Sequence, residues 1–310
     1  MPIVKPTEMD FSDKNIIAIF SGLPGTGKTT LALSAPDVLL IDTDEGLARV
    51  NPAHRKDASI CKTYEEILAD VKAAEGKYKT LVIDTCGALI EFMKDWAMRT
   101  DPKASKTNGG FSLQGYGVIK SEFIRLSAEL RKKFNVIYLF HEEMTKADDS
   151  VFYQLLVEGS ARTLVYQPAD LAGHIFIDHG KRYIGFTPTE QYSAKSAYGI
   201  KGIIEIPELK DGDANDFLTK LFTKVRSNLA AEGKALAPEK EKYDAAIAEA
   251  KTICAAVTNP EDVQYAAKTI KALNHALTSE KEATAMLKAR LAELGIVWDK
   301  TEKVYKYADK

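Results

Sequence analysis

The sequence has 310 residues, of which 45% are hydrophobic and 28% are charged, with a formal net charge of −2. This length suits one large domain or two smaller ones. The charge excludes a general attraction to nucleic acid, so any nucleic-acid surface has to be local. Three widely spaced cysteines fit a reducing compartment. Because there is no signal-peptide core and no apolar run of about 18 residues, we expect a soluble, cytoplasmic protein with no membrane partner.

Apolar, β-rich runs alternate with helical patterns from residue 15 to about residue 205. Helical patterns cover 63–76 and 119–134, and the first opens with a Thr63–Glu66 capping box. This alternation predicts an α/β fold with a mostly parallel sheet flanked by helices and with ligands at the carboxyl ends of its strands. The predicted strands are 16–20, 38–42, 80–84, 135–140, 174–178 and 182–186.

Helical patterns alone follow residue 217. A helix over 217–229 is followed by a stretch, 231–240, that is typical of a linker. Three amphipathic helices are expected after it. The second begins at Asn259-Pro260, and the third opens with a capping box at Ser279 and ends before Gly295. The sequence therefore predicts an N-terminal arm (1–14), a core (15–230) and a small C-terminal α-helical region (231–310).

A phosphate-binding motif, G-x-x-x-x-G-K-T, directly follows the first predicted strand. Its glycines let backbone N–H groups turn toward phosphates, Lys28 reaches the outer phosphates, and the Thr29 hydroxyl binds magnesium. A chance glycine-rich turn is disfavoured, because a strand precedes the motif, a helix follows it and every position is filled. The residues expected to bind the triphosphate are Gly22, Pro24, Gly25, Thr26, Gly27, Lys28, Thr29 and Thr30.

Polar residues follow three later strands. Asp84 fits a Walker B aspartate that holds magnesium, and His141 fits a sensor of the γ-phosphate. Asp44 or Glu45 fits the acid that orients and deprotonates water, and Glu45 is favoured narrowly for its longer side chain. Acidic residues are also common turn formers, and a lone histidine is often structural. Chain order together with the phosphate-binding motif favours the catalytic interpretation.

The stretches GLPGTGKTTLALSAPDVLLIDTDEGL, TLVIDT and LFHEE carry a resemblance to a known family. Their order resembles the RecA-like branch of P-loop ATPases. More narrowly, residues 15–205 are similar to phage AAA-type nucleotide-binding proteins, including the Sak-group single-strand annealing recombinases. The resemblance implies a RecA-like, DNA-stimulated ATPase that uses ATP and Mg²⁺ in the cytoplasm of a bacterial host. It also implies annealing or strand exchange on single-stranded DNA, by a homo-oligomeric ring or filament.

The resemblance also directs attention to basic residues. Relatives carry a Lys-x-Arg pair usable as a finger between subunits. Here Lys195 aligns and the arginine is missing, so Lys201 could substitute, although both could equally be ordinary surface lysines. The C-terminal region is a candidate contact for a single-strand-binding protein.

A long polar loop, 98–117, is expected between two helices. Lys103 and Lys106 could track phosphates, while Phe111 and Tyr116 could stack on unpaired bases. The alternative is a solvated loop whose aromatic rings tuck against the protein body.

Two other function classes remain open. A P-loop small-molecule phosphotransferase would use the loop 98–117 as a lid over its acceptor. A ring motor or nucleotide-switched scaffold would use the C-terminal helices as a partner adaptor.

Overall fold

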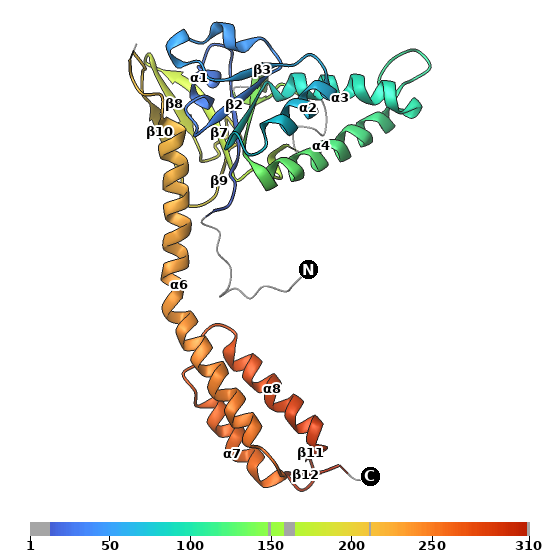
Figure 1. Ribbon diagram of the computed structural model, residues 1–310, viewed down its shortest axis with the longest axis vertical. Helices are drawn as coiled ribbons and strands as arrows, with labels where there is room; N and C mark the ends of the chain where they lie inside the picture. The colour runs from blue at the N-terminus through green and yellow to red at the C-terminus, as the bar shows by residue number, and fades with distance from the viewer. Residues whose placement is uncertain (1–12, 148–149, 158–164, 211, 309–310) are drawn as a thin grey trace. The chain divides into compact units, whose positions relative to one another are not determined.

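The computed structural model describes residues 13–147, 150–157, 165–210 and 212–308 (Figure 1). These residues form two compact units, a larger one that ends at Asn228 and a smaller one that begins at Leu229. The predicted N-terminal arm lies, apart from its last two residues, outside the described residues. None of the described helices is long and apolar enough to cross a membrane.

The larger unit is built on a mostly parallel sheet, which confirms the predicted α/β class. The strand order is β10-β8-β7-β1-β5-β4-β2-β3, and pairing from β7 to β3 is parallel throughout. Strands β6, β8, β9 and β10 pair antiparallel. The strands are β1 (Ile17–Gly22), β2 (Val38–Asp42), β3 (Ala58–Ile60), β4 (Thr80–Asp84), β5 (Asn135–Ala147), β6 (Ser150–Leu155), β7 (Leu171–Asp178), β8 (Lys181–Gly185), β9 (Lys195–Ser196) and β10 (Ile203–Ile206).

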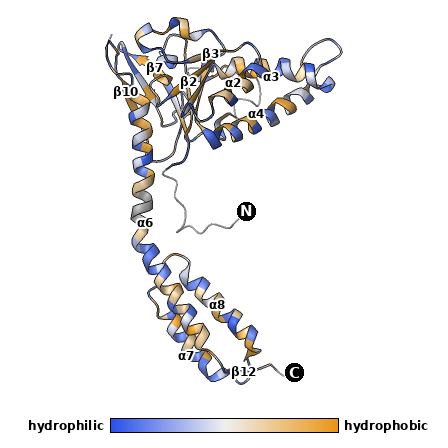
Figure 2. Cartoon of the chain, in the orientation of Figure 1, coloured by the Kyte–Doolittle hydropathy of each residue, from blue (hydrophilic) through white to orange (hydrophobic). Residues whose placement is uncertain are grey.

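Helices cover the sheet because its central strands are apolar on both faces. Every residue of β1, β2 and β4 is buried. Helices α2 (Tyr64–Ala74), α3 (Cys86–Thr100) and α4 (Leu113–Lys133) share one core with these strands, and Figure 1 shows them side by side. Figure 2 shows orange along the strands and an alternation of blue and orange along α4, as expected for a half-buried helix.

The strand order also creates the site. Strand β1 lies between β5 and β7, and the chain leaves β1 toward β2 on one side and returns as β7 on the other. Ligands of open α/β sheets bind at the carboxyl end of such a switch point. Gly22 at the end of β1 pairs with His141, and Asp42 pairs with Asp84 at the ends of β2 and β4. The predicted end of the fourth strand at residue 140 is wrong, because β5 continues to Ala147 by pairing with β6, so His141 lies within the strand.

The polar loop predicted over 98–117 is shorter than expected. Helix α3 runs to Thr100 and α4 begins at Leu113, with the short helix η4 (Pro102–Ala104) between them. Ser112 caps α4 by accepting a hydrogen bond from the Gly115 N–H at 3.0 Å. Gly115 indicates a turn in the sequence, but it lies inside the helix. A Cβ there would be 2.7 Å from the Phe111 ring, so close packing requires glycine.

The prediction of a linker over 231–240 is wrong. Helix α6 runs from Phe217 to Ala256 and includes Pro238. A proline inside a helix costs about 3 kcal/mol, which is why the sequence pattern favours an interruption. Alanine, glutamate, lysine and leucine make up most of the stretch, and these are the strongest helix formers.

The smaller unit packs the end of α6 against α7 (Pro260–Lys271), α8 (Ser279–Leu294) and a hairpin of β11 (Ile296–Asp299) and β12 (Val304–Tyr307). The predicted cap at Asn259 is confirmed, because its side chain accepts hydrogen bonds from Glu261 N and Asp262 N. The predicted end of α8 at Gly295 is also confirmed.

The predicted capping box at Ser279 is wrong. Thr278 is the N-cap of α8, and it makes no side-chain cap. Ser279 is instead buried, and its hydroxyl accepts a hydrogen bond from the Ala276 N–H at 3.0 Å. The Ser279 hydroxyl therefore stabilises the turn that precedes α8, instead of capping the helix.

Candidate active site

The glycines of the phosphate-binding motif occupy positions that other residues would not tolerate. Gly25 and Gly27 have φ values of 82° and 87°, in the left-handed region. A Cβ on Gly22 would lie 2.5 Å from the carbonyl oxygen of Ile175 on β7. The loop between β1 and α1 (Lys28–Ala32) can therefore approach a ligand with its backbone.

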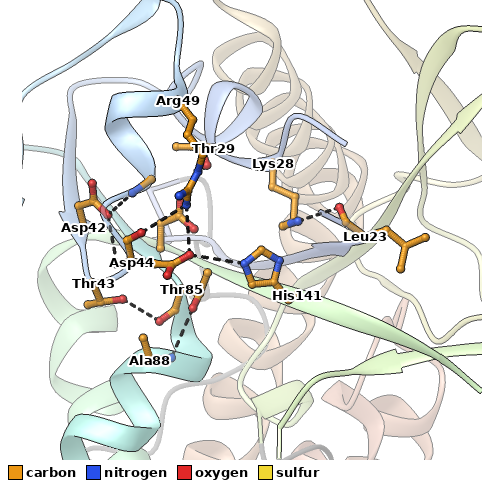
Figure 3. A network of polar contacts seen from close by, with 12 residues as sticks. Leu23, Lys28, Thr29, Asp42, Thr43, Asp44, Arg49, Thr85, Ala88 and His141 are labelled. Atoms are coloured by element: carbon orange, nitrogen blue, oxygen red, sulfur yellow. Dashed lines mark hydrogen bonds and ion pairs between the residues drawn. The ribbon is translucent and has the colours of Figure 1, made fainter. Parts of the chain in front are cut away.

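Lys28 points across the mouth of this loop. Its Nζ donates to the carbonyl oxygens of Gly22 and Leu23, each at 3.0 Å (Figure 3). Burial lowers the pKa of Lys28, and the negative charge of Asp84 opposes this effect. Pro24 and Thr26 complete the loop, where the Thr26 hydroxyl donates to the Leu23 carbonyl oxygen at 2.9 Å.

Thr29 and Asp84 meet although β5 lies between β1, which precedes Thr29, and β4, which ends at Asp84. The Thr29 hydroxyl donates to Asp84 Oδ2 at 2.6 Å. Burial raises the pKa of Asp84, while the hydrogen bond from Thr29 acts in the opposite direction. A hydroxyl and a carboxylate are oxygen ligands of the kind that Mg²⁺ takes beside phosphates. This donor set fits the expected metal.

Asp42 shapes the loop that follows β2. Its Oδ1 accepts the Gly46 N–H at 2.8 Å, and its Oδ2 accepts the Leu47 N–H at 2.9 Å. A Cβ on Gly46 would lie 3.1 Å from Asp84 Oδ2. The buried carboxylate of Asp42 thus holds the loop against the Asp84 side chain.

Asp44, just after the end of β2, and His141, within β5, come together, as Figure 3 shows. Asp44 Oδ2 lies 3.6 Å from His141 Nε2 and 3.2 Å from a guanidinium nitrogen of Arg49. His141 Nδ1 is buried and has no hydrogen-bond partner among the described residues. Glu45 is exposed, with a φ of 51°. The structure therefore joins Asp44, rather than Glu45, to the candidate sensor.

A buried network that the sequence patterns miss lies beneath the loop. The Ser21 hydroxyl donates to Glu142 Oε1 at 2.6 Å, and His174 Nδ1 lies 2.9 Å from Glu142 Oε2. All three residues are buried. Because Ser21 immediately precedes Gly22, this network supports the base of the phosphate-binding loop.

Two further residues, from distant parts of the chain, lie beside the loop or line a cavity next to it. A Cβ on Gly27 would lie 3.2 Å from Nε of Arg182, which belongs to β8. His54, in the short helix η3 (Pro52–His54), lines a cavity together with Gly27, Thr30 and Arg182. No sequence motif marks either residue, because both are far from the loop in the chain.

The two candidate finger lysines lie elsewhere. Lys195 is on β9, where its Nζ lies 3.3 Å from the carbonyl oxygen of Tyr166. Lys201 is exposed between β9 and β10. No hydrogen bond or ion pair joins either lysine to the described phosphate-binding loop.

The candidate DNA-binding residues divide into two pairs. Lys103 and Lys106 are exposed. Phe111 and Tyr116 pack edge to face, with ring centroids 5.0 Å apart, and both are partly buried against the core. Tyr116 lies on α4, outside the loop. The rings are therefore less available for stacking than the sequence predicts.

The fold and site define a P-loop nucleotide-binding domain of the ATPase type. A family model described as an AAA domain matches residues 14–198. This is more than half of the chain, and the chain belongs to this AAA-domain family. A comparison with curated proteins finds no match. The narrower resemblance to Sak-group recombinases is not confirmed by the family match.

Proposed function

We propose that the protein binds ATP with Mg²⁺ at the ends of β1 and β4 and hydrolyses it. The observation that carries this proposal is the 2.6 Å hydrogen bond between Thr29 and Asp84, beside the buried Lys28. Mg²⁺ held by Thr29 and Asp84 would neutralise charge on the phosphates. Lys28 would neutralise the remaining charge through its ammonium group.

Two residues beside the metal position are suited to the water and the γ-phosphate. Asp44 is held by Arg49 and lies close to His141. We assign it the role of orienting and deprotonating water, with Glu45 as the alternative. We assign His141, whose Nε2 lies beside Asp44, the role of sensing the γ-phosphate.

The proposed purpose of hydrolysis is the action of a phage recombination protein on single-stranded DNA, by annealing or strand exchange. The exposed Lys103 and Lys106 support this role, together with the sequence resemblance. The protein would work as a homo-oligomeric ring or filament, in which Lys195 or Lys201 reaches a neighbouring site. The C-terminal unit would contact a single-strand-binding protein.

The test measures ATP turnover with and without single-stranded DNA, with Lys28→Ala as the control. We expect DNA to increase turnover, and we expect Lys28→Ala to fold normally and to be inactive. Near-normal ATP turnover by a folded Lys28→Ala protein would show that ATP is not hydrolysed at this site. If the unmodified protein neither binds DNA nor responds to it, the DNA role fails while the ATPase stands.

A second function is favoured by a cavity of about 450 Å³ beside the strand ends. It is lined by His141, Glu143, Thr85 and the first turns of α3. Such a space suits the acceptor of a small-molecule phosphotransferase. That enzyme would turn over ATP only with an added acceptor, and DNA would have no effect.

A further inference from the structure

Arg49 is a positively charged residue of the candidate active site that no sequence motif marks. It ends the short helix η2 (Gly46–Arg49), in the loop that follows β2. Its guanidinium group lies 3.2 Å from Asp44 Oδ2 and donates to the Asp44 carbonyl oxygen at 3.3 Å (Figure 3). Arg49 therefore contacts the residue to which we assign the activation of water.

The same guanidinium group lies close to the proposed metal position, because Gly46 has no side chain. A Cβ on Gly46 would be 3.1 Å from Asp84 Oδ2 and 3.5 Å from Nη2 of Arg49. Both groups thus border the small space beside this glycine. Asp84 Oδ2 also accepts the hydrogen bond from Thr29. Arg49 consequently lies beside the place where Mg²⁺ and the outer phosphates would bind.

The contact between Arg49 and Asp44 is weak enough to be exchanged. The side chain of Arg49 is 68% exposed and that of Asp44 is 44% exposed. An exposed ion pair of this kind contributes about 1 kcal/mol or less. A phosphate group offers a guanidinium group two parallel, charge-assisted hydrogen bonds, which are stronger. A triphosphate bound at Lys28 would therefore compete with Asp44 for Arg49.

This exchange would prepare both residues for hydrolysis. During the reaction the water oxygen bonds to the γ-phosphorus, and the bond from that phosphorus to the β-phosphate oxygen breaks. Negative charge spreads over the γ-phosphate oxygens in the transition state, and an arginine at that position stabilises it. Asp44, released from Arg49, would accept the proton that the water loses.

We propose that Arg49 is a catalytic residue that acts on the nucleotide of its own chain, by exchanging its contact with Asp44 for the γ-phosphate of bound ATP. This inference rests on the proposed ATP hydrolysis. It places the arginine within one subunit, whereas the Lys-x-Arg pair expected between subunits lacks its arginine in this chain.

ATP turnover by Arg49→Ala is the first test. We expect turnover at saturating ATP to fall about 1,000-fold or more, the lower value for loss of such an arginine. Arg99→Ala is the matched control, because Arg99 forms a comparable exposed ion pair with Glu65 at 2.8 Å. This control should keep the wild-type rate. Near-normal turnover by a folded Arg49→Ala protein would overturn the proposal.

A comparison of two ligands separates a catalytic role from support of the loop. ADP with Mg²⁺ and aluminium fluoride imitates the transition state, so its affinity for Arg49→Ala should fall in parallel with turnover. The affinity for a non-hydrolysable ATP analogue should fall by no more than about tenfold, since binding it exchanges one contact of Arg49 for another. Equal losses of both affinities would indicate a disturbed loop and would overturn the proposal.

Mixing two inactive variants tests whether Arg49 acts within its own chain. In a mixture of Arg49→Ala and Lys28→Ala no chain has both residues, so turnover should stay low. Recovery of turnover would show that Arg49 acts on a neighbouring chain's nucleotide, against the proposal. If the wild-type protein hydrolyses no ATP, the proposed function itself fails. An active wild type together with an equally active Arg49→Ala contradicts the role of Arg49 alone.

Discussion

Asp84 is a carboxylate that folding removes from water, at 4% exposure. Burial raises its pKa above the ordinary value of 3.8. At pH values between 3.8 and the raised pKa, the folded state binds more protons than the unfolded state. Stability from this group is therefore present below pH 3.8 and is lost as the pH rises through the raised pKa. The ionised Asp84 carboxylate, which the proposed chemistry requires, therefore lowers the stability of the folded state at neutral pH.

We therefore expect Asp84→Asn to raise the midpoint of thermal unfolding at neutral pH and to lower ATP turnover at least about 100-fold. The gain in stability should vanish in acid, where the wild-type carboxyl is protonated. Thermal unfolding over a pH series measures this. Asp42→Asn is the matched control, and it should destabilise because the Asp42 carboxylate accepts backbone N–H groups. A lower midpoint for Asp84→Asn at neutral pH would contradict the argument.

The choice between Asp44 and Glu45 is also decided by single residues. We expect Asp44→Asn to lower turnover at saturating ATP by about 100-fold or more, as for loss of a general base. Glu45→Gln should stay near the wild-type rate. The exposed ion pair of Asp44 with Arg49 contributes about 1 kcal/mol or less, so both variants should fold. A loss confined to Glu45→Gln would restore the assignment that the sequence favours.

At the scale of elements, the segment between α3 and α4 combines exposed lysines with an aromatic pair that supports the helices. Phe111 packs on Gly115 and Tyr116, and Lys94 Nζ lies 5.8 Å from the centroid of the Tyr116 ring. Replacing the rings would therefore disturb α4 as well as any binding of DNA. The lysines can be removed without touching the core.

We expect the double variant Lys103→Ala/Lys106→Ala to bind single-stranded DNA more weakly. Its salt dependence should be flatter by about one unit for each DNA phosphate that a lysine no longer neutralises. Because Phe111 and Tyr116 pack on each other and on the core, Phe111→Ala/Tyr116→Ala should lower the unfolding midpoint. It should weaken DNA binding by less than the value of a stacked base, about 1–3 kcal/mol, with little change in salt slope. Affinities over a salt series test both, with thermal unfolding as the check on α4. Lys268→Ala/Lys271→Ala, on α7, is the control. Wild-type affinity in both loop variants would exclude this segment.

At the scale of the whole molecule, nucleotide binding should stabilise only the larger of the two units. The phosphate-binding loop and Asp84 both belong to the larger unit, which ends at Asn228. A ligand that binds only the folded form stabilises that form by about 2.7 kcal/mol at a hundredfold excess over its dissociation constant. The smaller unit has its own apolar core and contains none of these residues.

We expect ATP to raise the unfolding temperature of the larger unit and to leave that of the smaller unit unchanged. The chain has two tryptophans, Trp96 on α3 and Trp298 on β11. Trp298→Phe leaves a reporter in the larger unit, and Trp96→Phe leaves one in the smaller unit. Fluorescence-detected unfolding of each variant with and without ATP measures the two shifts. Equal shifts in both would show that the units unfold together.

Local patterns determined much of this protein from its sequence. The phosphate-binding motif, the capping box of Thr63 and Glu66 and the cap at Asn259 each depend on residues within a few positions of one another. The same holds for the apolar runs that became β1, β2 and β4. Such features are readable because their hydrogen bonds and their period are local. The sequence patterns do not predict strands β3, β6, β9, β10, β11 and β12. All of these except β6 have four residues or fewer, which is too short for a clear alternation.

The tertiary structure alone decided how distant residues meet. Strand order brings Thr29 to Asp84 across β5, and it brings Asp44 to His141. It also places Arg182 beside the phosphate-binding loop, although no motif marks this residue. Helix α6 continues through a stretch that the sequence assigns to a linker. These outcomes depend on packing between residues far apart in the chain, and local patterns do not record such packing.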